Sequence, residues 1–525
     1  MSSEPQALQV SNPWLVTVAI SIATFMEVLD STIVNVSLRY IAGGLAVGPD
    51  EASWVVTSYL VANAIVLCAS SWISQAIGRR LFFLTCVAIF TVSSILSGLS
   101  WSLNSLLFFR IVQGLAGGGM TPVALSILAV TFPPEKRAQG FALYGVAVVV
   151  APVVGPTLGG WLTDSLSWHW CFFINGPVGI LCFVLIWVLL KETPEAVRQR
   201  AEHWRKGIGF DWIGFILVAG FLACLQVCLA EGQRKAWFAS DFIRVFATLS
   251  AACLVLSIPW ELSREKPLID MRMLGTRQFG SCFVIMLATG GVLMATTQFM
   301  PQLLQDYYGY TAMLAGLALS PGGLVTAVMM AVIARISRYV PGKYLIAGGA
   351  LIVAGAMYNL TKIYGGLDFD WFVWQRVYLG VGLPMIFLAI TSASYDGIPP
   401  EKTDQASAMI NVARNTGGSI GVAIAQNVLA DRQQFHQSRL VENAVPSNPQ
   451  YQEALRQVTE YFSHAGSIAE AKAQAFAWIA KEVQLQAAFL SYIDVFFVLA
   501  LMSLAMVPLA FLLRSSVGGS PAGGR

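Results

Sequence analysis

Three ionisable side chains lie inside long apolar runs, and their types suit proton chemistry. Glu27 and Asp30 are three residues apart, which places them on one face of a helix. Arg110 lies in a later apolar run, at a depth similar to that of Asp30 if the two helices are antiparallel. A charge at bilayer depth costs about 2.5–3.5 kcal/mol on insertion scales, so each of the three needs a partner or a function.

The spacing of these residues suggests a switch. A carboxylate that faces an arginine stays ionised, whereas the same group in an apolar cavity without the arginine takes up a proton. We therefore expect Asp30 to carry a coupled proton, with Arg110 controlling its protonation and Glu27 assisting. The alternative is a static ion pair that holds two helices together.

Polar side chains in the second half of the chain are candidates for a substrate cavity. Asn411, Arg414 and Asn415 have i, i+3, i+4 spacing and therefore share one helical face near mid-depth. Arg414 is expected to line the cavity or to neutralise a carboxyl group, and it would suit anionic or amphiphilic cargo; purely structural pairing is the alternative. The residues expected to line the cavity are Asn35, Gln113, Gln298, Arg376, Asn411, Arg414 and Asn415.

The composition requires a membrane protein that crosses the bilayer many times. Of 525 residues, 56% are hydrophobic and only 12% are charged, against about 25% charged in soluble proteins; the mean hydropathy is +0.65. The net charge of +3 and the lack of a basic run argue against a nucleic-acid partner. The cysteines lie mostly in apolar runs, and Cys224 and Cys228 lack the further ligands of a metal site.

The lengths of the apolar runs predict fourteen membrane-spanning helices, since one span needs about 20 residues. They are expected at 14–37, 53–75, 81–100, 105–131, 138–163, 169–190, 210–231, 240–261, 278–301, 311–336, 344–363, 371–394, 404–430 and 487–513. Lysine and arginine concentrate in alternate loops, which predicts that both termini are cytoplasmic. The opposite short loops and their flanks hold only Arg39, Arg234, Lys235 and Lys362.

Several motifs recur 266 residues apart, which indicates two copies of one design. Arg110 and Gly114 reappear as Arg376 and Gly380, and Gly155 reappears as Gly421. The same offset places Thr296 where an acidic partner of Arg376 would stand, so we expect proton coupling in the N-terminal half. Internal repeats are typical of secondary transporters. The predicted organisation is a cytoplasmic N-terminus (1–13), a six-helix bundle (14–190), a linker with two inserted helices (191–277), a second six-helix bundle (278–513) and a cytoplasmic tail (514–525).

Four motifs, in order and on the expected helices, resemble the major facilitator superfamily and, within it, the fourteen-helix drug:proton antiporters of the EmrB/QacA type. Leu29–Val36 resembles the LDxTxVNVA motif of the first helix, and Arg110–Gly114 resembles RxxQG of the fourth. Phe172–Pro177 resembles the FFIN-P pattern of the sixth helix, and 151–160 resembles the fifth-helix antiporter motif. The residues carried over for this last motif are Pro152, Gly155, Pro156, Gly159 and Gly160.

The resemblance implies an all-α, 6+2+6 transporter of the bacterial inner membrane that exports drugs or amphiphiles by alternating access, driven by the proton gradient and without a bound cofactor. One departure concerns the loop after the second helix, where the family motif G-x3-D-R-x-G-R-R carries an aspartate. Gln75 replaces that aspartate and only Gly78, Arg79 and Arg80 remain. A cytoplasmic latch that depends on the aspartate is therefore in doubt.

The polar segment 431–486, before the last helix, is expected on the outer side, with helical patterns in Tyr451–Phe462 and Ile468–Val483. It is either a solvated loop or a docking surface. The resemblance favours docking, because EmrB-like pumps work with a periplasmic adaptor and an outer-membrane channel.

Other function classes find little support. An enzyme would need clustered catalytic groups, yet the four histidines are scattered (His169, His203, His436 and His464), and there is no GxxxxGK[ST] nucleotide loop. A non-transporting sensor or scaffold and a proton-coupled uptake symporter stay as alternatives.

Overall fold

A computed structural model describes residues 8–10, 12–194, 197–198, 200, 209–264, 267–399, 402–463 and 467–513. The predicted tail 514–525 and most of the predicted N-terminal segment 1–13 lie outside the described residues. The same is true of His203, within 201–208 of the predicted linker, and of His464.

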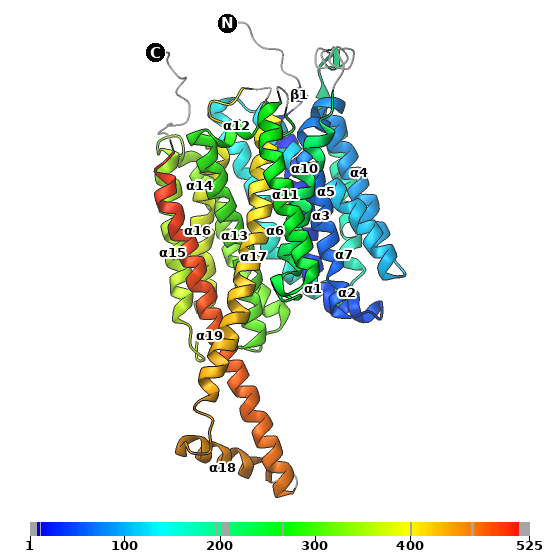
Figure 1. The fold of residues 1–525 in the computed structure, drawn as a ribbon. Helices are drawn as coiled ribbons and strands as arrows, with labels where there is room; N and C mark the ends of the chain where they lie inside the picture. The colour runs from blue at the N-terminus through cyan, green and yellow to red at the C-terminus, as the bar shows by residue number, and fades with distance from the viewer. Residues whose placement is uncertain are drawn as a thin grey trace.

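Helices make up nearly all of the described chain (Figure 1). In the first half they are α1 (Pro13–Gly44), α2 (Pro49–Ala52), α3 (Trp54–Ile77), α4 (Arg79–Gly98), α5 (Leu103–Thr131), α6 (Pro134–Ser165), α7 (Trp170–Phe173), α8 (Asn175–Leu189), α10 (Trp212–Glu231) and α11 (Asp241–Ser263). In the second half they are α12 (Met271–Leu274), α13 (Arg277–Asp306), α14 (Ala312–Ile336), α15 (Gly342–Asn359), α16 (Phe369–Ala393), α17 (Thr403–Val441), α18 (Pro449–Ser463) and α19 (Ile468–Ala510). Short 3-10 turns occur at Trp237–Ala239 and Leu360–Lys362.

Thirteen helices in the described part of the chain are long and apolar enough to cross a membrane. Helix α17 is not among them, because polar residues such as Asp404, Asn411 and Arg414 lower its mean hydropathy. It nevertheless packs against α13 and α19, and its first half is largely buried. We therefore count it as the fourteenth span, in agreement with the prediction.

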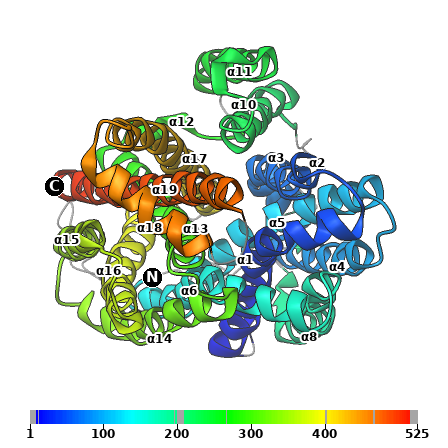
Figure 2. The ribbon, with the colours of Figure 1, turned by 90° about the horizontal axis from the view of Figure 1, so that it is seen from below.

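The spans gather into two groups with α10 and α11 beside them, as Figure 2 shows. In the N-terminal bundle α1 packs on α6 and α8, and α5 packs on α3 and α4. In the C-terminal bundle α13 packs on α17, and α16 packs on α14 and α15. Helix α10 contacts α3 of one bundle and α17 of the other.

The repeat-related glycines both lie where corresponding helices of the two bundles pack together. A side chain at Gly155 of α6 would meet Thr32 of α1, and one at Gly421 of α17 would meet the backbone of Gly291 in α13. Small residues let two helix backbones approach closely. The 266-residue offset thus relates α1 and α6 to α13 and α17.

The fold is not entirely helical. Strands β1 (Leu8–Val10) and β2 (Leu190–Glu192) pair antiparallel, with Leu8 opposite Glu192 and Val10 opposite Leu190. The prediction placed Leu8–Val10 in the cytoplasmic N-terminus and ended a membrane span at Leu190, because three-residue strands are too short to show a period in the sequence. This pairing ties the start of the chain to the end of the first bundle.

The segment 431–486 is mostly helical rather than a loop. Helix α17 continues to Val441 and α19 begins at Ile468, so the predicted spans 404–430 and 487–513 are each extended by a polar helical arm. The helical patterns predicted at Tyr451–Phe462 and Ile468–Val483 are confirmed as α18 and the first part of α19. The continuation of α17 to Val441 was not predicted, because this part of the helix is polar. In Figure 1 the arms project beyond the bundles and carry α18 at their tip.

Candidate functional site

Asp30 and Arg110 form an ion pair in the N-terminal bundle. Arg110 Nη1 lies 2.6 Å from Asp30 Oδ2, and both side chains are fully buried. Because α1 and α5 place these residues at the same level, the predicted pairing is confirmed. The role of the pair in proton coupling stays a prediction.

Arg110 is held by groups of α3. Its Nε donates to the carbonyl oxygen of Val55 at 3.1 Å, and its guanidinium lies 4.2 Å from the centre of the Tyr59 ring. Gly114, one turn further along α5, leaves no room for a side chain against the Tyr59 backbone. The RxxQG motif therefore supplies both the cation and the close contact that positions it.

Two amides complete the surroundings of Asp30. Gln113 Nε2 donates to Asp30 Oδ1 at 2.9 Å, and Asn175 Nδ2 donates to the same oxygen at 2.8 Å. Gln113 was predicted as a cavity residue, but it is fully buried and serves the ion pair. Asn175 was not predicted to belong to the site, although it lies in the FFIN-P pattern and begins α8.

Glu27 lies one turn from Asp30 in a separate polar environment. Its carboxylate accepts hydrogen bonds from Thr121 Oγ1 at 2.9 Å and from Asn63 Nδ2 at 3.2 Å. No cation among the described residues forms an ion pair with it. Glu27 is thus a buried carboxylate whose hydrogen-bond partners are neutral and which interacts electrostatically with Arg414 of the other bundle.

A chain of hydrogen bonds leads from Glu27 to the other bundle. Asn415 Nδ2 of α17 donates to Asn63 Oδ1 at 3.4 Å, and Asn415 Oδ1 accepts from Nε and Nη2 of Arg414 at 3.2 and 3.1 Å. The carboxylate of one bundle is thereby connected to the guanidinium of the other through two amides. Neither Asn63 nor this connection was predicted, because sequence spacing says nothing about contacts between the bundles.

The remaining predicted cavity residues do not form one cluster. Asn411 is buried and donates to the Ser407 carbonyl of its own helix. Arg376 Nη2 donates to Thr297 Oγ1 at 3.2 Å, also in the buried interior. Asn35 and Gln298 are exposed on α1 and α13, and Asn35 donates to the carbonyl of Ser31. The structure thus brings Arg414 and Asn415 together and leaves Asn35 and Gln298 outside the polar network described above.

The predicted antiporter motif lies where α6 meets α1 and α14. Pro152 and Pro156 are inside α6, where each removes a backbone hydrogen bond. Side chains at Gly155 and Gly159 would collide with Thr32 and Ile33 of α1. Gly160 is also buried, next to the exposed Trp161. The motif residues form a helix-packing surface.

A cross-bundle latch closes the end that the lysine and arginine pattern assigns to the cytoplasm. Arg79 Nε and Nη2 donate to the two carboxylate oxygens of Asp404 at 2.9 and 3.2 Å, and Ser126 also donates to Asp404. Phe141 and Tyr395 stack across the same end, with ring centres 5.3 Å apart. Gln75 stands where the family motif has an aspartate, and Asp404 of the other bundle supplies a carboxylate at this end instead. The role of Asp404 was not predicted, because the family motif concerns a single loop of the first bundle.

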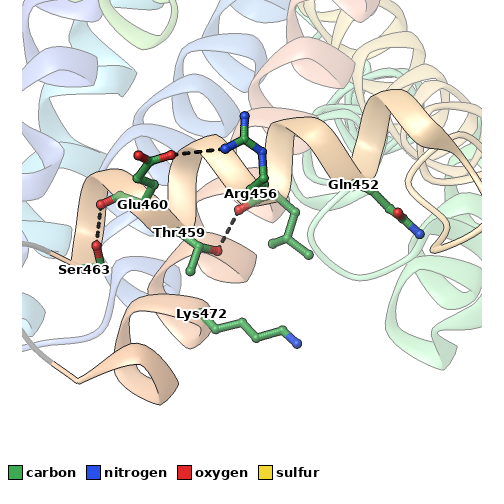
Figure 3. A pocket seen from close by; sticks show the side chains of 7 residues that line it. Gln452, Arg456, Thr459, Glu460, Ser463 and Lys472 are labelled. Carbon is green, nitrogen blue, oxygen red and sulfur yellow. Dashed lines mark hydrogen bonds and ion pairs between the residues drawn. The ribbon is translucent and has the colours of Figure 1, made fainter.

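A shallow pocket lies between α18 and α19 at the far end of the molecule (Figure 3). Its lining residues are Gln452, Leu455, Arg456, Thr459, Glu460, Ser463 and Lys472. Arg456 lies 2.7 Å from Glu453, and this hydrogen bond with that of Gln457 lowers the pKa of Glu453 to about 2. The surface is therefore charged at any physiological pH.

Comparison with known proteins gives consistent matches. The family model described as "Major Facilitator Superfamily" matches residues 20–422. "Multidrug export protein EmrB" of Escherichia coli (strain K12) is 32% identical over 516 residues, which cover 97% of each chain. "Fatty acid resistance protein FarB" of Neisseria gonorrhoeae is 32% identical over 451 residues, covering 86% of this chain and 87% of that one.

A solved structure has the same overall fold at lower sequence identity. It is a bacterial homologue of the human lysosomal transporter Spinster, in an inward-facing and occupied conformation. The TM-score is 0.56 with 17% identity, and the match covers 99% of this chain and all of that one.

Proposed function

The chain belongs to the major facilitator superfamily, and we propose that it is a proton-driven exporter of hydrophobic or amphiphilic compounds across the bacterial inner membrane. The observation that carries this proposal is the buried Asp30 carboxylate, held by Arg110, Gln113 and Asn175. A fully buried carboxylate requires such compensation. It also offers one site at which a proton can change the charge of the core.

Proton uptake at Asp30 would alter the forces on α1 and α5. A neutral carboxyl group no longer attracts the guanidinium, and Arg110 keeps Val55, Tyr59 and the amide oxygen of Gln113 as partners. The same helix α1 carries Glu27, whose contacts reach the second bundle through Asn63 and Asn415. A proton bound on α1 is therefore transmitted to the interface that must open and close during alternating access.

Two observations support export as the direction of transport: the motif in α6 and the names of the similar proteins. Two prolines and several glycines of the antiporter-like motif lie in α6, at its contacts with α1 and α14. The names of the similar proteins refer to multidrug export and to fatty acid resistance. Both observations favour export over uptake.

We also propose that the helical arms dock a periplasmic adaptor that leads to an outer-membrane channel. Helix α18 has no buried residue, and Tyr461 and Ile468 near the tip of the arms are 75% and 77% exposed. Exposed aromatic and aliphatic side chains beside charged ones are typical of a protein-binding surface. This partner class is the one that the resemblance to EmrB-like pumps implies.

Transport of a fluorescent lipophilic dye in inverted membrane vesicles tests the proposal. An acidic lumen should drive dye into the lumen in exchange for protons, and a protonophore should abolish this accumulation. Dye that leaves the lumen together with protons would indicate an uptake symporter instead. Dye movement that matches that of vesicles without the protein would indicate a sensor or scaffold.

A further inference from the structure

The two bundles carry repeat-related arginines, but only one of them has an acidic partner. Arg110 pairs with Asp30 at 2.6 Å. Its repeat mate Arg376 has Thr296 at the position equivalent to Asp30, and the Thr296 hydroxyl donates to carbonyls of its own helix. The C-terminal bundle therefore repeats the guanidinium of the pair without the carboxylate.

Arg376 is buried and incompletely bonded. Its side chain is 2% exposed; Nη2 donates to Thr297, and Nη1 has no hydrogen-bond partner. On the helices that pack against α16, Asp306 of α13 bonds Tyr492, and Asp164 of α6 bonds Tyr40. Among the described residues no carboxylate forms an ion pair with Arg376, and α14 and α15 carry no acidic residue.

A second cation of the same bundle is also unneutralised within that bundle. Arg414 is 6% exposed, donates from Nε and Nη2 to the amide oxygen of Asn415, and leaves Nη1 without a hydrogen-bond partner among the described residues. The backbone of Arg414 packs against Gly290 of α13, whereas the side chain of Arg376 reaches Thr297 of the same helix. The C-terminal bundle thus contains two buried guanidinium groups.

A buried guanidinium stays protonated and is stable only when an anion or several hydrogen-bond acceptors compensate it. Since the described residues supply neither at Arg376, we propose that the anionic head group of an amphiphilic cargo binds there, in the place that Asp30 occupies in the N-terminal bundle. A carboxylate, sulfonate or phosphate matches the fork of donors that arginine offers. Arg414, in contrast, interacts electrostatically with Glu27 of the N-terminal bundle. This inference rests on the proposed export function and specifies the cargo class.

Binding of matched ligands tests the inference. The full chain is placed in nanodiscs of phosphatidylcholine alone, so that no anionic lipid is present. Dodecanoate, dodecanol and dodecyltrimethylammonium share one alkyl chain and differ in head-group charge. Their dissociation constants are measured by quenching of tryptophan fluorescence for the wild type, Arg376→Gln and Arg376→Lys. Arg244→Gln removes the same charge from an exposed position on α11 and is the control.

The wild type should bind dodecanoate about tenfold more tightly than the cation, which corresponds to one charge-assisted hydrogen bond. Arg376→Gln should lose this preference while it keeps its affinity for dodecanol, and that retained affinity shows that the variant is folded. Arg376→Lys should keep part of the preference, and Arg244→Gln all of it.

Equal affinity of the wild type for the three ligands would overturn the inference, and so would an unchanged preference in Arg376→Gln. An anion preference that appears only after phosphatidylglycerol is added would show that Arg376 binds a lipid head group rather than cargo. Proton-driven dye transport in the same preparation separates the two proposals. If the dye moves and no anion preference exists, the export function stands and only the cargo assignment fails.

Discussion

At the scale of single residues, the two buried carboxylates of α1 have different surroundings. Asp30 has a cation and two amides, whereas Glu27 has a hydroxyl and an amide. The pairing of Asp30 with Arg110 could be predicted, because helix spacing and insertion depth follow from the sequence. The contributions of Asn175 and Asn63 could not, because an uncharged amide in an apolar run does not reveal which helix it faces.

Loss of Arg110 should destabilise the protein more than loss of Asp30. Arg110→Ala leaves the Asp30 carboxylate buried without its counter-charge, a change that costs about 3–5 kcal/mol for buried pairs. The double variant Asp30→Asn, Arg110→Ala should regain part of that loss, because no uncompensated charge remains. Thermal unfolding of the purified protein in detergent measures both effects. A double variant less stable than Arg110→Ala alone would mean that the carboxylate is stabilised by other groups.

At the scale of helices, the structure shows how a missing motif residue is replaced. Arg79 at the start of α4 bonds Asp404 at the start of α17, so the latch joins the two bundles directly. The sequence raised the question at Gln75 but could not answer it, since Asp404 is 325 residues away from Arg79 along the chain. Likewise the extension of α17 to Val441 was not predicted, because this part of the helix is polar.

The latch predicts a specific conformational effect. Asp404→Asn should weaken the contact between Arg79 and α17 and populate states open to the cytoplasm. Exchange of the two charges, Arg79→Asp with Asp404→Arg, should restore closure in part, because the attraction is retained. Distances between spin labels on the cytoplasmic ends of α4 and α17 report the opening. An unchanged distance distribution in Asp404→Asn would show that the aromatic stack of Phe141 and Tyr395 closes this end without the ion pair.

The helical arms predict a separation of two activities. Replacement of α18 by a short flexible linker should leave dye transport in vesicles largely intact, because α18 packs on α19 and lies outside both bundles. The same change should abolish drug resistance in cells that have an outer membrane. An equal loss in both assays would show that the arms serve folding rather than docking.

At the scale of the whole molecule, the duplication explains most of the architecture. The repeat predicts two bundles with corresponding helix pairs, and Gly155 and Gly421 lie in the packing of α6 on α1 and of α17 on α13. The duplication does not extend to the ion pair, because Thr296 occupies the position that corresponds to Asp30. The pair of strands β1 and β2 lies outside the repeat and could not be predicted from it.

The proposed orientation predicts which end of the molecule is reached from outside the cell. In a variant without reactive native cysteines, Ser447→Cys, between α17 and α18, should react with an impermeant thiol reagent added to intact spheroplasts. Tyr339→Cys, 82% exposed in the wild type between α14 and α15, should react only after the membrane is opened. The opposite pattern would reverse the orientation and remove the basis for a periplasmic partner.

The measurement that tests the account most directly is substrate-induced proton release in proteoliposomes. Wild type, Asp30→Asn and Glu27→Gln are compared after addition of a transported dye. Asp30→Asn removes the titratable proton but nearly preserves shape, so it should still bind dye and release no proton. Glu27→Gln should release protons with reduced amplitude, since Asp30 and Arg110 remain. Full proton release from Asp30→Asn would contradict the assignment, and loss only in Glu27→Gln would move the coupled proton one turn along α1.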